Sequence, residues 1–146
     1  MFVTLEGLDG SGKSSVLRAI QKEFDDVVTT SEPSDLKCGE LIRDNLSDES
    51  TNSLMDFYLF MTDRVHHIEK RVREADENNK LVVSDRYADS TRAYQAVGLA
   101  ESEHFYEQSD AELFIEQVMG PWNYSPDLTL YVDVSVDTAI ERSSGD

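Results

Sequence analysis

Cysteine is almost absent from this sequence of 146 residues, since Cys38 is the only one. One cysteine cannot form an internal disulfide, and it cannot by itself build a metal cluster. Long apolar runs are absent too, because none approaches the about 18 consecutive residues that a bilayer-spanning helix needs. The first residues, Met1-Phe2, lead directly into a strand-like run and show no signal-peptide pattern. These absences predict a cytoplasmic protein that does not cross a membrane.

Basic residues are also scarce, with 13 Lys and Arg against 30 Asp and Glu, which gives a net charge of −17. Such a charge repels nucleic acid polymers and argues against a DNA- or RNA-binding protein. Apolar residues make up 39% of the chain, which is too much for a disordered protein. We therefore expect a folded protein with an acidic surface suited to high salt, where screening relieves self-repulsion, and a halophilic source.

A phosphate-binding loop lies near the N-terminus. The strand-like run at residues 2–5 leads into Gly7, four residues intervene, and Gly12-Lys13-Ser14 opens a helical pattern. This is the G-x-x-x-x-G-K-[ST] spacing. Glycines let successive N–H groups converge on phosphate oxygens, and the start of the helix favours the same anion. The residues predicted to bind a nucleoside triphosphate are Gly7, Leu8, Asp9, Gly10, Ser11, Gly12, Lys13, Ser14 and Ser15.

Two side chains of this loop carry the chemistry of the site. Lys13 would supply a cation for the β and γ phosphates, and Ser14 a hydroxyl group for Mg²⁺. The alternative is a glycine-rich turn with an incidental lysine.

Strand-like and helix-like patterns alternate along the chain, which predicts an α/β fold with a parallel, doubly wound sheet in a single domain, residues 1–146. The expected strands are 2–6, 27–30, 80–85 and 128–134, and the expected helices are 13–24, 36–46, 52–78, 88–97, 105–119 and 135–142. Residues 47–50 are expected to be a polar connector. The apolar stripe of the longest helix comprises Leu54, Phe57, Tyr58, Met61, Val65, Ile68 and Val72.

A second cluster, Ser84-Asp85-Arg86-Tyr87, follows the buried strand at residues 80–85. Its place at the carboxyl end of that strand puts it beside the phosphate-binding loop. Asp85 can hold Mg²⁺ or its waters, and Arg86 can bridge the phosphates of a donor and an acceptor, as phosphoryl transfer requires. The alternative for each residue is a surface salt bridge.

Two further groups point to an acceptor pocket. Phe60 and Arg64 lie four residues apart, hence on one helix face, where they can stack on a base and bond its edge. The alternative for Phe60 is an ordinary core position. Polar residues at Ser90, Thr91 and Tyr94 recur close to Asp85-Arg86 and could line the same pocket.

Together with Ser31-Glu32-Pro33 and the run at residues 126–134, these motifs resemble the thymidylate kinase family over essentially the whole chain. The resemblance implies a P-loop NTPase fold and transfer of the γ-phosphoryl group of ATP to dTMP, giving dTDP, with Mg²⁺. It also implies a homodimer, whose interface the helices at 54–72 and 105–119 could supply.

Matched by position, Asp9 would face the 3′-hydroxyl group of dTMP, Phe60 would stack on thymine, and Arg64 would bond its edge. Lys13, Asp85 and Arg86 would be catalytic, Ser14 and Asp85 would hold the metal, and Glu32, Ser90, Thr91 and Tyr94 would complete the substrate site. Ser31 stands where the family commonly has arginine, and Arg43 could replace that phosphate contact. His66, His67 and His104 are expected to be solvated.

The family continues with an arginine-bearing lid, a helix and a last strand, whereas this sequence ends at Asp146. Its P-loop interior, Leu8-Asp9-Gly10-Ser11, has no arginine either. We therefore expect a domain without the lid and last strand. Either the sequence is part of a longer chain, or the protein has lost its charge-stabilising arginine and binds nucleotide without turnover.

Two other functions stay open. A related P-loop kinase would accept another deoxynucleotide or a deoxynucleoside. A regulatory nucleotide-binding protein would need switch loops and a base-specificity motif such as N-K-x-D, and the sequence has no such motif.

Overall fold

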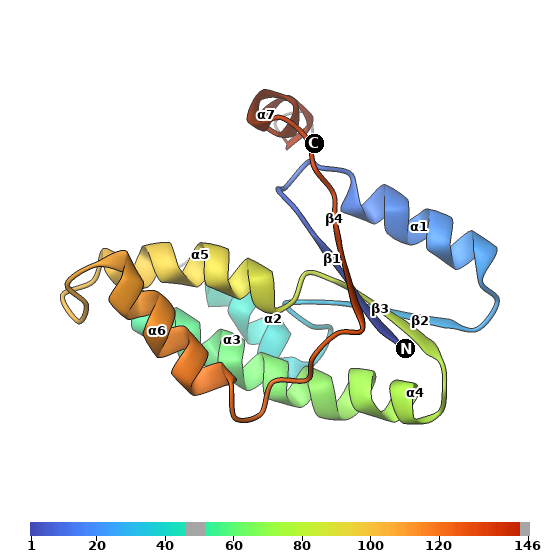
Figure 1. Ribbon diagram of the computed structural model, residues 1–146, viewed down its shortest axis with the longest axis horizontal. Helices are drawn as coiled ribbons and strands as arrows, with labels where there is room; N and C mark the ends of the chain where they lie inside the picture. Colours follow the sequence, from blue (N-terminus) through green and yellow to red (C-terminus); the bar gives the residue numbers. More distant parts are fainter. Residues whose placement is uncertain (46–51, 144–146) are drawn as a thin grey trace.

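A parallel sheet of four strands forms the centre of the molecule in the computed structural model, which describes residues 1–45 and 52–143 (Figure 1). The strands are β1 (Phe2–Glu6), β2 (Val27–Ser31), β3 (Leu81–Asp85) and β4 (Leu128–Tyr131), in the spatial order β2-β3-β1-β4. All three pairings are parallel. The predicted strands and the α/β class are therefore confirmed.

The last strand is shorter than predicted. It was expected to reach residue 134, but β4 ends at Tyr131, which pairs with Glu6 at the end of β1. One more backbone bond follows, from the N–H group of Val132 to the carbonyl of Glu6 at 2.8 Å. Beyond it Gly7 turns β1 into the phosphate-binding loop, so β4 has no further strand to pair with.

The helices follow the predicted order with small shifts at their ends. They are α1 (Lys13–Glu23), α2 (Lys37–Asn45), α3 (Ser53–His67), a π-helical turn η1 (Ile68–Val72), α4 (Arg73–Glu77), α5 (Ala88–Ala100), α6 (Gln108–Met119) and α7 (Val136–Ser143). The helix predicted over 52–78 is thus α3, η1 and α4 in succession. Leu46 and the connector predicted at 47–50 lie outside the described residues.

Apolar side chains leave the sheet alternately to its two faces. Phe2 and Val82 belong to a large core with α3, α5 and α6, whereas Val3, Leu5 and Val83 pack against α1. Figure 1 shows α1 on the opposite side of the sheet from α3, α5 and α6. Because both faces of the central strands are covered, β1 and β3 need continuous apolar runs. No helix in the described part of the chain is long and apolar enough to cross a bilayer.

The predicted apolar stripe of the long helix was too broad. Phe57, Met61, Ile68 and Val72 are buried, but Tyr58 is 50% exposed and Val65 46% exposed. The core side of α3 is narrower than the stripe because buried polar residues share that side of the helix, as described below.

Candidate active site

The phosphate-binding loop connects β1 to α1. It needs glycine at two positions where its backbone passes close to the backbone of another segment. Gly7 has φ +147° and Gly10 has φ +76°, values that side-chain-bearing residues rarely adopt. A Cβ atom on Gly7 would lie 2.6 Å from the carbonyl oxygen of Val132, and one on Gly10 would lie 2.4 Å from that of Ala139. Gly7 and Gly10 thus let the loop run directly against the residue that follows β4 and against α7.

Lys13, the first residue of α1, folds its side chain back over this loop. Its Nζ donates to the carbonyl oxygens of Gly7 and Leu8, both at 2.9 Å. Burial lowers the pKa of Lys13 and the charge of Arg86 lowers it further, while Asp85 and Asp9 oppose the shift. An anionic phosphate bound here would stabilise the charged ammonium group.

A cavity of about 490 Å³ opens above the loop, and we call it the P-loop cavity. Its lining comprises Asp9, Gly10, Gly12, Lys13, Ser14, Ser15, Arg18, Ser31, Glu32, Pro33, Asp85, Arg86 and Arg142. Arg142 of α7, an exposed residue, was not predicted; its Nη1 is 3.5 Å from the carbonyl oxygen of Gly10. The cavity therefore combines the backbone of the loop with several cationic side chains.

Asp85 ends β3 inside this cavity. Its Oδ1 atom is buried and has no hydrogen-bond partner among the described residues. Burial raises the pKa of Asp85, against the opposing charges of Lys13 and Arg86. A buried carboxylate oxygen without a partner is unusual, because such groups are normally satisfied. Asp85 therefore has an open position for a hard cation or for a water that such a cation carries.

Arg86 adopts the left-handed conformation, with φ +70°, while its N–H group still donates to the carbonyl of Leu5 at 2.9 Å. Its guanidinium group reaches Asp9 of the loop at 2.5 Å and Ser90 of α5 at 3.0 Å. It also lies 5.2 Å from the ring centre of Tyr94. A strained residue held by partners on two other elements is typical of a functional position.

A second cavity of about 230 Å³ adjoins the first, and we call it the aromatic pocket. It is lined by Asp9, Glu32, Pro33, Phe60, Arg64, Arg86, Tyr87, Ser90, Thr91, Tyr94 and Gln95. Every residue predicted to bind an acceptor is thus gathered in one pocket, with the exception of Arg43. That side chain is exposed, and its Nη1 donates to the carbonyl of Pro33 at 3.1 Å.

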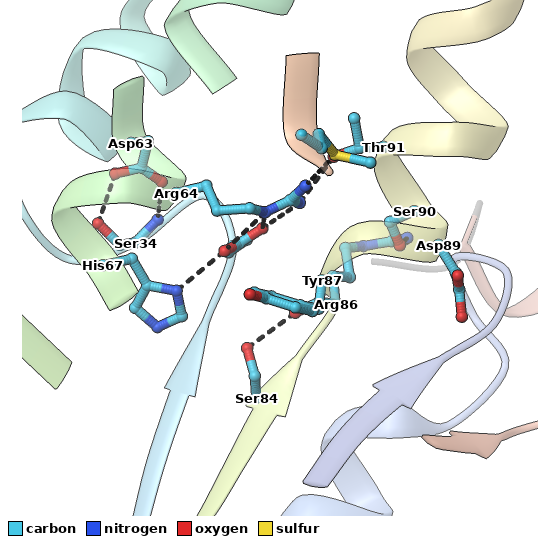
Figure 2. A network of polar contacts seen from close by, with 12 residues as sticks. Ser34, Asp63, Arg64, His67, Ser84, Arg86, Tyr87, Asp89, Ser90 and Thr91 are labelled. Atoms are coloured by element: carbon cyan, nitrogen blue, oxygen red, sulfur yellow. Dashed lines mark hydrogen bonds and ion pairs between the residues drawn. The ribbon is translucent and has the colours of Figure 1, made fainter. Parts of the chain in front are cut away.

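Arg64 does not reach the pocket as an isolated cation. It is 1% exposed, its Nε donates to Glu32 Oε2 at 2.9 Å, and its Nη2 donates to Thr91 at 2.7 Å (Figure 2). His67 bonds the same carboxylate, with Nδ1 at 3.0 Å from Oε1. The expectation that His67 is solvated is therefore wrong, because this side chain is fully buried. His66 is half-buried, and His104 is exposed as expected.

Two buried carboxylates that the sequence analysis missed hold the pocket in shape. Glu6 accepts from the N–H group of Tyr87 at 2.9 Å and from the hydroxyl of Ser90 at 2.5 Å. Asp63 accepts from the N–H and hydroxyl groups of Ser34, at 2.7 and 2.6 Å. For Glu6 the available signal was an acidic residue at the end of an apolar run, whereas Asp63 lies between Thr62 and Arg64 and has no such signal beside it.

A parallel sheet with a phosphate-binding loop between β1 and α1 defines the P-loop class of nucleotide-binding proteins. In this protein a second pocket adjoins the P-loop cavity, and Arg86 lines both. The comparisons with known proteins narrow that class. A family model described as thymidylate kinase matches residues 5–146. The chain therefore belongs to the thymidylate kinase family.

Relatives from several groups of organisms support this assignment. A probable thymidylate kinase of Halobacterium salinarum is 39% identical, over 98% of this chain and 70% of that protein. A thymidylate kinase of Nitratidesulfovibrio vulgaris is 35% identical, over 98% of this chain and 66% of that protein. The crystal structure of thymidylate kinase from Ehrlichia chaffeensis matches with a TM-score of 0.70 and 28% identity, over 99% of this chain and 81% of that one.

Proposed function

We propose that this protein transfers the γ-phosphoryl group of ATP to dTMP, giving dTDP and ADP. The observation that carries the proposal is that the P-loop cavity and the aromatic pocket share Asp9, Glu32, Pro33 and Arg86. A phosphate site and a site suited to a base therefore meet at one guanidinium group. This is the arrangement that direct transfer between two bound nucleotides needs.

The lining of the aromatic pocket supports a nucleoside monophosphate as acceptor. Phe60 offers a ring for stacking on thymine, and Arg64 and Thr91 offer polar groups for its edge. Asp9 would accept from the 3′-hydroxyl group of the sugar, while Tyr94 and Ser90 would border the sugar and phosphate. Glu32 acts through Arg64, to which it is hydrogen bonded.

The P-loop cavity would hold ATP, with the loop N–H groups and Lys13 on its phosphates. Ser14 and Asp85 fit Mg²⁺: Ser14 is exposed at the start of α1, and Asp85 has the unpartnered oxygen described above. Magnesium commonly takes only one or two protein ligands beside phosphate oxygens and waters. Bound there, it would neutralise charge on the β and γ phosphates.

In the reaction an oxygen of the dTMP phosphate bonds to the γ-phosphorus as the bond to the β,γ-bridging oxygen breaks. The electron pair of that bond leaves with ADP. Arg86 would lie between the two anions and reduce their repulsion while the oxygens approach. Positioning and charge neutralisation supply most of the rate enhancement in such transfers.

Several properties of the whole protein belong to the same proposal. Residues 1–146 would form one nucleotide kinase domain in the cytoplasm of a halophilic organism. The protein would be a homodimer through α3 and α6, which expose the apolar side chains of Met55, Tyr58, Val65 and Leu113. Light scattering after size exclusion would test the dimer, since a purely monomeric protein would contradict it.

The test of the proposed function is a coupled ADP-release assay with ATP, Mg²⁺ and each deoxynucleoside monophosphate in molar KCl. We expect clear preference for dTMP. Preference for another deoxynucleotide, or for thymidine, would instead support a related P-loop kinase. Binding of ATP without turnover of any acceptor would support a regulatory nucleotide-binding protein.

A further inference from the structure

A buried polar cluster joins the end of β2 to α3 behind the aromatic pocket. Its members are Thr30, Glu32, Arg64, His67 and Thr91, and Glu32, Arg64, His67 and Thr91 are each less than one-tenth exposed. In Figure 2 dashed lines run from both His67 and Arg64 to one shared, unlabelled carboxylate. The hydrogen bonds identify it as that of Glu32. Glu32 and Arg64 line the pocket, whereas His67 does not. His67 therefore lies one step behind the pocket wall.

The hydrogen bonds of the cluster assign a donor to each contact. An ionised carboxylate only accepts, so Nδ1 of His67 donates to Glu32 Oε1 at 3.0 Å. The other ring nitrogen, Nε2, lies 2.7 Å from the hydroxyl oxygen of Thr30, which donates to it in the neutral tautomer. Both ring nitrogens thus have partners, and the ring cannot rotate without losing both.

Glu32 in turn limits where Arg64 can point. Its Oε2 accepts from both Nε and Nη2 of Arg64, at 2.9 and 2.5 Å, and its Oε1 accepts from the same Nε at 3.3 Å, so two adjacent donors of the guanidinium group converge on one carboxylate. Such paired contacts fix the plane of the group as well as its position. In this orientation Arg64 also donates to Thr91 at 2.7 Å and to the sulfur of Met119 at 3.0 Å, and it lies 4.8 Å from the ring centre of Tyr87.

The charge of Glu32 is maintained inside this cluster. Burial acts to raise the pKa of Glu32, but the charge of Arg64 and the hydrogen bonds from His67 and Arg64 outweigh it and lower the pKa. His67 contributes a donor that no water can replace easily at a site with so little exposure.

We propose that His67 is a positioning residue of the aromatic pocket, which orients Glu32 so that Glu32 presents the Arg64 guanidinium group to the acceptor base. The proposal rests on the proposed function for the identity of that acceptor. The competing explanation is that His67 only stabilises the fold. A positioning role predicts a change in KM for dTMP when His67 is replaced, whereas a purely structural role predicts lower stability without that selective change.

The experiment compares His67→Phe, which keeps a ring but removes both hydrogen bonds, with His67→Asn, whose amide can replace the Nδ1 donor. His66→Asn, one residue earlier on α3, is the matched control. We expect His67→Phe to raise KM for dTMP about tenfold, with KM for ATP unchanged and kcat changed much less. His67→Asn is expected to restore much of the loss. Equal changes in both KM values, or lower thermal stability with an unchanged KM for dTMP, would overturn the proposal.

A double-mutant cycle tests whether His67 acts through Glu32. Glu32→Gln and His67→Phe should together raise KM for dTMP by little more than the larger single effect. The reason is that both substitutions disturb the same chain of contacts, from His67 through Glu32 to Arg64. Independent, multiplied effects would overturn the proposed path.

One measurement does not depend on turnover. In nitrogen-15 NMR spectra of the wild-type protein, the Nε–H proton of Arg64 should exchange slowly, and His67→Phe should accelerate that exchange. Should the wild type fail to phosphorylate dTMP, the proposed function would fail, but this comparison would still decide the role of His67. Unchanged exchange in His67→Phe would overturn it.

Discussion

The guanidinium group of Arg86 donates to the Asp9 carboxylate across 2.5 Å, and this contact ties the end of β3 to the phosphate-binding loop. The Asp9 side chain is 74% exposed, whereas that of Arg86 is only 17% exposed. Arg86 is thus set into the wall between the two cavities, and Asp9 stands at their common opening. An acceptor hydroxyl group or phosphate can compete for either partner, since the pair is open to solvent on the Asp9 side.

Replacing Arg86 should therefore affect transfer far more than nucleotide binding. Because Arg86 neutralises charge as the two phosphates approach, we expect Arg86→Ala to lower kcat by about 10³-fold. Arg86→Lys should recover part of this rate. The control is Arg92→Ala on α5, whose partners Asp89 and Glu116 form partly exposed ion pairs outside both cavities. A fall in kcat below about tenfold for Arg86→Ala would contradict the bridging role.

Phe60→Ala tests the stacking surface of the aromatic pocket. Loss of one base–aromatic contact costs about 1–3 kcal/mol, so KM for dTMP should rise by roughly five- to 150-fold. KM for ATP should stay as it is, because Phe60 does not line the P-loop cavity. Phe24→Ala, at the exposed end of α1, serves as the control. An unchanged KM for dTMP would mean that Phe60 is an ordinary packing residue.

Glu32→Gln should destabilise the fold as well as the site. It leaves the buried charge of Arg64 without its counterion, which costs about 3 kcal/mol in the free energy of unfolding. Asp35→Asn removes an exposed partner of Arg71 and should cost less than about 1 kcal/mol. Urea unfolding at neutral pH compares the two, and equal losses would contradict the difference in burial.

The same variant isolates a pH effect. The pKa of Glu32 in the folded protein lies below its usual value of 4.5, since the lowering effects of Arg64 and His67 outweigh the opposing effect of burial. Its stabilising contribution is therefore complete above the pKa of the unfolded chain and is lost as pH falls through the lower folded value. The stability difference between wild type and Glu32→Gln should shrink on acidification below about pH 4.5.

Asp85→Asn should separate stability from activity. Burial raises the pKa of Asp85, so its ionisation opposes folding as pH rises from the unfolded value through the raised folded value. At neutral pH the neutral amide avoids that penalty, and we expect a small gain in the free energy of unfolding, because the partial exposure of Asp85 lets solvent screen part of the effect. Turnover with Mg²⁺ should fall at least about a hundredfold, since the variant lacks the carboxylate that we propose holds the metal. A lower free energy of unfolding for this variant would contradict the idea that the ionised Asp85 carboxylate destabilises the fold.

The acidic surface predicts a salt requirement. With a net charge of −17, the folded chain repels itself, and added salt screens that repulsion. The free energy of unfolding should rise steadily between low and molar KCl. An equal concentration of sucrose separates screening from general exclusion effects. A fold indifferent to KCl would contradict adaptation to high salt.

Local chemistry determined much of this protein. The P-loop spacing, the apolar run before Asp85 and the helical pairing of Phe60 with Arg64 depend only on residues close in sequence. Steric and hydrogen-bond rules act at that range, so the order of strands and helices and most residues of both cavities could be predicted.

Tertiary structure alone decided which partner each polar group meets. His67 was expected to be solvated, because nothing nearby in sequence shows that Thr30 and Glu32 lie against it. Glu6 and Asp63 were overlooked for the same reason, since their donors Tyr87 and Ser34 are distant in sequence. A buried carboxylate is stable only where the fold brings donors to it, and no local pattern encodes that meeting.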